Sequence, residues 1–194
     1  MLYRIFRFIF LIYLKIFNRF QVVGQENIPM EGPVILVSNH VSNWDPLVLG
    51  SASTRQVHFL AKESLFKAPV IGWLMKAWGV LPLKRGRGDR EAIVKSLEIL
   101  SNNLILGIFI EGTRNKIHPE KMKEPQPGAA MMTLKSGAPV VPMLLINTHQ
   151  IFSLKKVVAR IGPSLHFENN PEIDKKELYT KISGQIVNAI ERMR

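Results

Sequence analysis

The residues whose types and spacing best suit catalysis are His40 and Asp45, which stand five positions apart just after an apolar segment. Residues 34–37 form a short run rich in β-branched side chains, a pattern that predicts a buried strand. His40 should therefore leave the sheet at the carboxyl end of a strand, where α/β proteins bind ligands. An imidazole can take a proton from a hydroxyl near neutral pH, while a carboxylate on its other nitrogen fixes the tautomer. The pair predicts a general base oriented by an aspartate.

Asp45 also fits a structural role, because Asp45-Pro46 resembles a helix start with Asp at the N-cap and Pro at the first helical position. The two roles are compatible, since a carboxylate has two oxygens. No metal site is predicted, because no cysteine exists and the other histidines are scattered rather than set at ligand spacing from His40. The chain also lacks a Gly-x-Ser-x-Gly segment and a phosphate loop of Walker type.

A second polar segment, Glu111-Gly112-Thr113-Arg114, directly follows the apolar residues 104–110, which predict another buried strand. Gly112 permits a tight turn with positive φ, and backbone N–H groups around it can face an anion. The planar guanidinium of Arg114 suits a phosphate. The alternative is a surface turn closed by a Glu111–Arg114 ion pair, worth about 0–1 kcal/mol.

Taken together, these segments resemble the glycerolipid acyltransferase family, typified by the 1-acyl-sn-glycerol-3-phosphate (lysophosphatidic acid) acyltransferases. Four segments follow one another in the family's order: Asn39-His40-x-Ser42-x-x-Asp45, residues 79–85, Phe109-x-Glu111-Gly112-Thr113-Arg114, and Val141-Pro142. Such an order is far more specific than any single segment. Two features depart from the family pattern. Ile110 stands where a proline is usual, and residues 82–84 differ from the tripeptide of many members.

The resemblance implies that His40 deprotonates a glycerol hydroxyl, which then attacks the thioester carbonyl of an acyl donor, while Asp45 holds the imidazole. It also implies a substrate-binding set in which Arg85 is a second phosphate contact: Arg85, Glu111, Gly112, Thr113 and Arg114. Lys62, which follows the predicted strand 57–61, is a further binding candidate, although most lysines are simply solvated.

The expected reaction is acyl transfer to 1-acyl-glycerol 3-phosphate, giving phosphatidic acid. The donor would be acyl-CoA or an acyl-carrier-protein thioester acting as co-substrate, with no permanently bound cofactor. Glycerol 3-phosphate, a lysophospholipid or another polar lipid is an alternative acceptor. Two other classes stay open: a non-catalytic lipid-binding module, and a phosphatase or hydrolase that uses the His40–Asp45 pair on water.

Residues 1–20 predict an amphipathic helix with a wide apolar face and a basic stripe that contains Arg4, Arg7, Lys15 and Arg19. Its longest charge-free run, residues 8–14, is too short to span a bilayer, which takes about 20 apolar residues. This pattern is typical of a helix lying in an anionic membrane interface, so we expect peripheral or monotopic association with the cytoplasmic face of the cell membrane. The alternative is a helix packed on the protein's own core.

The net charge of +11 and the pI near 10.1 favour a polyanionic partner. An anionic membrane, a phosphorylated acceptor and an acidic carrier protein all satisfy this preference. Nucleic acid is not expected, because the basic residues are dispersed and no nucleic-acid module is visible. A length of 194 residues suits one catalytic domain, residues 22–194, preceded by a membrane-associating segment, residues 1–21.

Apolar strands alternate with amphipathic helices along the rest of the chain, which predicts an α/β fold. We expect a central, mostly parallel or mixed sheet flanked by helices, with the N-terminal amphipathic helix added. Residues 66–78 carry many apolar side chains that could line an acyl groove, touch lipid or belong to the core. The core is the preferred interpretation, because apolar helical faces are usually buried.

Overall fold

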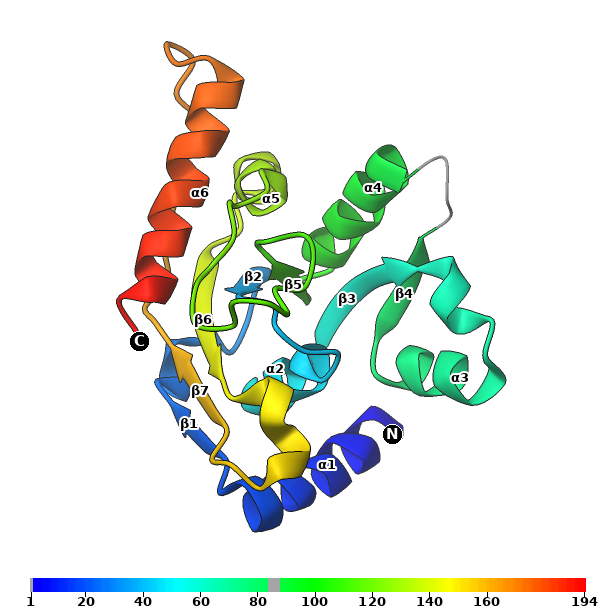
Figure 1. Cartoon of the computed structure of the whole chain (residues 1–194). Helices are drawn as coiled ribbons and strands as arrows, with labels where there is room; N and C mark the ends of the chain where they lie inside the picture. The colour runs from blue at the N-terminus through cyan, green and yellow to red at the C-terminus, as the bar shows by residue number, and fades with distance from the viewer. Residues whose placement is uncertain (1, 84–87) are drawn as a thin grey trace.

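The computed structural model describes residues 2–83 and 88–194 and shows a twisted sheet with helices on both faces (Figure 1). The strands in the described chain are β1 (Gln21–Val23), β2 (Val34–Ser38), β3 (Val57–Lys62), β4 (Val80–Leu83), β5 (Ile105–Phe109), β6 (Val140–Ile146) and β7 (Val158–Ile161). The α-helices are α1 (Leu2–Asn18), α2 (Asp45–Ala52), α3 (Pro69–Ala77), α4 (Gly88–Ser101), α5 (Gly128–Ser136) and α6 (Lys175–Glu191). Short 3₁₀ turns are η1 (Gln25–Asn27), η2 (Glu63–Phe66) and η3 (Thr148–Ser153).

The sheet order is β1-β7-β6-β2-β5-β3-β4, with β2 at its centre. Strand β2 pairs in parallel with both β5 and β6, and β3 pairs in parallel with β5 and β4. Strand β7 runs antiparallel to β6, and β1 is parallel to β7. The predicted fold class, an α/β fold with a mostly parallel, mixed sheet and flanking helices, is confirmed.

The central strand β2 has helices packed over both its faces, and all five of its residues are buried. Its side chains alternate between two cores, as strand geometry requires: Val34 and Leu36 lie in one core, Ile35 and Val37 in the other. Helices α1 and α2 contribute to the first core. Helices α4, α5 and α6 cover the second (Figure 1). This burial on both faces makes the carboxyl end of β2 a rigid base for the residues that follow it.

Helix α1 forms as predicted and has two roles in the described structure. One face packs on the first core, where Leu14 is fully buried. Arg7 donates hydrogen bonds to the carbonyl oxygens of Gly50, Ser51 and Ser53, at 3.1, 3.1 and 2.5 Å. A cation is favourable at that place, because it lies at the carboxyl end of α2. Arg7 is therefore committed to the protein itself, while the opposite face of α1 carries exposed apolar side chains.

The preference for residues 66–78 as core is wrong for most of α3. Trp78 is buried and Phe66 packs against the first core, but Val70, Ile71 and Trp73 are more than half exposed. No helix in residues 2–83 and 88–194 is long and apolar enough to cross a membrane.

Candidate active site

The two polar segments meet because β2 and β5 are neighbouring parallel strands whose last residues, Ser38 and Phe109, are register partners. The chain continues from both strands in the same direction. The backbone N–H of His40 donates to Glu111 Oε1 at 2.8 Å, and the N–H of Asn115 donates to the His40 carbonyl oxygen at 2.7 Å. The two polar segments therefore meet at one edge of the sheet.

Asn39 fixes the direction in which the chain leaves β2. Its buried side chain donates to the Leu145 carbonyl oxygen at 3.0 Å and accepts from the Leu145 N–H at 2.8 Å. The amide thus replaces one backbone rung between β2 and β6, satisfying groups that would otherwise be buried without partners. The backbone is free to turn at His40, and the imidazole leaves the plane of the sheet.

His40 and Asp45 form a direct pair, with His40 Nδ1 at 2.7 Å from Asp45 Oδ2. Since a carboxylate only accepts, Nδ1 carries the proton, and Nε2 of the neutral ring keeps its lone pair. No protein group in the described chain hydrogen-bonds Nε2, and 17% of the side chain is exposed. The ring can therefore accept a proton from a molecule that approaches from outside.

Asp45 is fully buried and has a donor for each oxygen. Besides His40, Oδ2 accepts the N–H groups of Val41 and Ser42 at 2.7 and 2.8 Å, and Oδ1 accepts the hydroxyl of Thr148. The N-cap interpretation was wrong. Asp45 is the first helical residue of α2, Trp44 occupies the N-cap position, and the amides that Asp45 binds precede the helix. The carboxylate orders the loop of residues 39–44 instead of capping the helix.

Two aromatic rings support the imidazole from one side. The ring of Phe109 stacks on His40 at 4.0 Å between centroids, and Phe59 stacks on Phe109 at 5.9 Å. Gly107 makes room for this stack, because a Cβ there would lie 2.3 Å from a Phe59 ring carbon. Ring plane and tautomer are thus both determined before any substrate binds, which reduces the reorganisation needed for proton transfer.

Glu111 is nearly fully buried, and both its oxygens are occupied. Oε1 accepts from the His40 N–H, and Oε2 accepts from the Lys123 N–H at 3.1 Å. The alternative of a Glu111–Arg114 ion pair is not observed among the described residues. Glu111 therefore joins the two loops, and its orientation leaves the turn after it to face solvent.

The turn of Gly112 and Thr113 is exposed, and Gly112 has a φ of 65°, as expected for a tight turn. Arg114 extends from this turn to the loop of residues 39–44, where its guanidinium donates to the side-chain oxygen of Asn43. Lys123 donates to the Arg114 carbonyl oxygen at 2.9 Å, which brings a second cation to the same loop. An open basic surface therefore lies next to the loop that contains His40 and leads to Asp45. Its cationic groups suit a phosphate.

The other predicted binding residues are less closely connected. Lys62 ends β3 on the same side of the sheet and is exposed, and no hydrogen bond or ion pair in the described chain joins it to His40 or Arg114. Arg85 lies outside the described residues. No group of three His, Cys, Asp or Glu side chains suited to a metal occurs within the described ranges.

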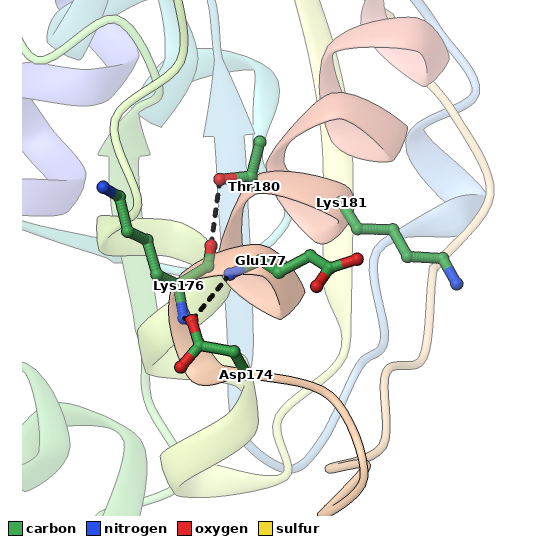
Figure 2. A pocket seen from close by; sticks show the side chains of 5 residues that line it. All are labelled: Asp174, Lys176, Glu177, Thr180 and Lys181. Atoms are coloured by element: carbon green, nitrogen blue, oxygen red, sulfur yellow. Dashed lines mark hydrogen bonds between the residues drawn. The ribbon is translucent and has the colours of Figure 1, made fainter.

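A surface hollow at the first turn of α6 contains none of the predicted site residues (Figure 2). It is lined by Asp174, Lys176, Glu177, Thr180 and Lys181. Asp174 caps the helix there by accepting the N–H of Lys176 at 2.9 Å. The hollow therefore lies apart from the candidate site at the ends of β2 and β5.

Thr148 and Lys123 are parts of the site that sequence reasoning missed. Thr148 follows β6 and is fully buried, yet it stands 103 positions from the aspartate that it binds. No spacing pattern reveals such a partner. Only the resemblance in Val141-Pro142, on the preceding strand β6, directed attention to this part of the chain.

Replacing Thr148 with valine is expected to lower kcat about tenfold and leave the substrate KM values nearly unchanged. Valine has a similar shape but removes the one donor to Asp45 Oδ1, and a hydrogen bond to a charged group contributes about 1.5–3 kcal/mol. Thr148→Ser should restore most of the rate. Steady-state kinetics with thermal melting would check this. Equal losses in the valine and serine variants would contradict the role of the hydroxyl.

An α/β sheet whose strand ends carry a His–Asp pair beside an arginine-bearing turn is what the resemblance to the acyltransferases leads us to expect. The family described as Acyltransferase matches residues 19–146, and this chain belongs to that family. The protein is therefore an acyltransferase enzyme.

Individual relatives narrow the comparison. The 1-acyl-sn-glycerol-3-phosphate acyltransferase of Borreliella burgdorferi is 31% identical over 183 residues, which cover 89% of this chain and 72% of that protein. The protein of the same name from Saccharomyces cerevisiae is 28% identical and covers 89% of this chain, which spans only 60% of that relative. The crystal structure of the 1-acyl-sn-glycerophosphate acyltransferase from Thermotoga maritima is similar, with a TM-score of 0.72 and 26% identity over 93% of this chain and 74% of that chain.

Proposed function

We propose that this acyltransferase moves a fatty acyl group from a thioester donor to the free hydroxyl of 1-acyl-glycerol 3-phosphate, giving phosphatidic acid. The observation that carries the proposal is the position of His40 Nε2, which has no hydrogen-bond partner among the described residues and lies beside the loop that bears Arg114. A single acceptor carrying a hydroxyl and a phosphate could contact both groups. The names of the Borreliella, yeast and Thermotoga relatives support this choice of acceptor.

In the proposed reaction, His40 Nε2 takes the hydroxyl proton as the oxygen attacks the thioester carbonyl. Asp45 stabilises the imidazolium that forms, since its charge lies 2.7 Å from Nδ1. The tetrahedral intermediate then expels the thiolate, which recovers the proton from His40. General-base assistance of this kind contributes about 10²–10⁴ in rate. No covalent acyl-enzyme is needed.

In this proposal Arg114 and the exposed turn of Gly112 and Thr113 hold the acceptor phosphate, with Arg85 and Lys62 as further cationic contacts. Glu111 acts by orienting that turn, because its oxygens already accept backbone N–H groups. Acyl-CoA and acyl-carrier protein are both proposed donors, since both are acidic and the chain carries a net charge of +11.

We also propose that the enzyme works at an anionic membrane surface as a peripheral or monotopic protein on the cytoplasmic face. The support is the outer face of α1, where large apolar side chains such as Phe8, Ile9 and Ile16 are exposed beside Arg4 and Lys15. Such a face is typical of helices that lie in the interface plane. Acceptor and product would both remain in that membrane.

The proposal is tested by incubating the purified protein in detergent with one long-chain acyl thioester and a panel of acceptors. The acylation of 1-acyl-glycerol 3-phosphate should be faster than that of glycerol 3-phosphate or of uncharged lysolipids. Thioester loss should require the acceptor. Thiol release at the same rate without any acceptor would indicate a hydrolase and would refute the assignment.

Replacing Arg114 with alanine should raise the KM for the acceptor about 10–100-fold, since a charge-assisted hydrogen bond contributes about 1.5–3 kcal/mol. The KM for the acyl donor should change little. Arg192→Ala, an exposed arginine at the end of α6, is the matched control. Initial rates with each substrate varied in turn measure both constants. Equal changes for donor and acceptor would remove the phosphate-binding role.

A further inference from the structure

Large apolar side chains of two separate helices are exposed to solvent in this structure. On α3 and the preceding η2 turn these are Leu65, Val70, Ile71, Trp73 and Leu74, with exposed fractions between 40% and 70%. On α1 they are Leu2, Ile5, Phe8, Ile9, Ile12, Ile16 and Phe17, between 42% and 66%. Soluble proteins rarely expose so many large apolar side chains together, so these faces require a partner.

The two faces adjoin each other. Phe6 of α1 and Trp73 of α3 make an edge-to-face contact with 5.3 Å between ring centroids, and Tyr3 lies 5.3 Å from Trp78, at the carboxyl end of α3. Figure 1 shows the N-terminal end of α1 directed toward α3. The exposed apolar side chains therefore belong to one surface, which we call the two-helix face: the exposed apolar residues of α1, η2 and α3 named above.

We propose that the two-helix face, and not α1 alone, enters the interfacial region of an anionic bilayer, with α3 as a second inserted element. This inference rests on the membrane association proposed above and identifies the surface that makes the contact. A single helix lying in the interface can roll about its own axis. A second helix in contact with the first removes that freedom, so the orientation of the active site toward the lipid is set.

Charge selects an anionic membrane as the occupant of this face. Neither α1 nor α3 contains an acidic residue, and in these two helices and η2 the single carboxylate is that of Glu63. Arg4 and Lys15 on α1 are exposed, as are Lys67 and Lys76 around α3. A second copy of this chain is disfavoured as the partner, because two such faces would bring cations against cations. Anionic headgroups would neutralise these side chains, each contributing about 1 kcal/mol near a charged surface.

Deletion of α1 would not test this inference cleanly. Leu14 belongs to the first core, and Arg7 and the buried Asn18 hydrogen-bond distant carbonyl groups. Removing the helix would therefore destabilise the fold as well as remove apolar surface. Exposed side chains of α3 can be changed without this complication, since Val70 and Ile71 lie at its first turns and are 70% and 54% exposed.

The experiment compares the Val70→Ser/Ile71→Ser double variant with the wild-type chain. Partitioning onto vesicles of phosphatidylcholine with about a third phosphatidylglycerol is measured by co-sedimentation. The double variant should bind at least about tenfold more weakly, because it removes two inserted apolar side chains. The matched control is Met30→Ser/Val94→Ser, which removes exposed apolar side chains outside the two-helix face and should bind like wild type.

Trp73 supplies a direct optical readout. Its fluorescence should shift to the blue on vesicle binding and be quenched by lipids brominated on the acyl chain. The Trp73→Phe variant should lose most of this quenching, because the other two tryptophans, Trp44 and Trp78, pack in or against the first core. Quenching that is unchanged by Trp73→Phe would place the inserted tryptophan elsewhere and overturn the role of α3.

Equal partitioning of the α3 variant and its control would also refute the inference. A fall in oligomer mass in the α3 variant, measured by light scattering after size exclusion, would identify the face as a contact between copies. Activity separates this test from the test of the proposed function. The α3 variant should acylate short-chain acceptors free in solution at the wild-type rate. If neither the wild type nor any variant acylated any acceptor, the proposed function would be refuted, and the membrane inference would still be decided by the vesicle measurements.

Discussion

Replacing His40 with alanine is expected to lower the rate of acyl transfer by about 10³-fold or more, because the variant loses the group that takes the acceptor proton. The fold should be retained. The backbone N–H of His40 would still donate to Glu111, and Asn39 would still pair with Leu145. Loss of kcat at unchanged melting temperature would identify a chemical role, and rates would be measured with saturating donor and acceptor.

His166→Ala is the matched control, since His166 is exposed and lies outside the candidate site. Added imidazole should restore part of the activity of His40→Ala. His166→Ala should have wild-type activity without added imidazole. A His40→Ala protein that keeps turnover within about tenfold of wild type would show that another group serves as the base.

Replacing Asp45 with asparagine is expected to lower kcat by about 10²–10³-fold with modest loss of stability, because the change removes charge and preserves shape. The amide oxygen can take the place of Oδ2, where it accepts from His40 Nδ1, Val41 and Ser42. The amide nitrogen then faces Thr148, whose hydroxyl can rotate to accept. The imidazole keeps its tautomer but loses the anion that stabilises its protonated form.

Asp45→Ala separates the two contributions of this aspartate. It would leave the buried N–H groups of Val41 and Ser42 without acceptors, at a cost of about 1–3 kcal/mol for each unsatisfied group. We therefore expect the alanine variant to melt well below the asparagine variant, as measured by calorimetry. If Asp45→Asn were as active as wild type, the carboxylate charge would have no part in the reaction.

Local pattern was sufficient to predict the elements that carry the site. Continuous apolar runs predicted β2 and β5, because parallel strands with both faces buried have this pattern. The start of α6 has a similarly local cause, because the side chain of Asp174 accepts two backbone N–H groups of the first helical turn. In each case the residues that indicate the element lie close together in the sequence, so a local pattern is enough to predict that element.

The assignment of apolar helices to core or surface could not be made in this way. Periodicity shows which side of α1 or α3 is apolar, but it does not show what covers that side. The core interpretation for residues 66–78 failed because Gly72 seats the helix against η2, where a Cβ would lie 2.4 Å from the Phe66 carbonyl oxygen. Gly72 is the buried residue of α3, and its neighbours Val70, Ile71 and Trp73 are exposed.

By itself, the sequence determined the chemical inventory of this protein: a histidine and a carboxylate five positions apart, a glycine-bearing turn with an arginine, and the strands that precede them. Only the tertiary structure decided the partners of these groups. Glu111 binds the His40 backbone across 71 positions, and Thr148 binds Asp45 across 103. Such contacts depend on the order of the strands in the sheet, which arises from the burial of the whole core at once and leaves no periodic trace in the chain.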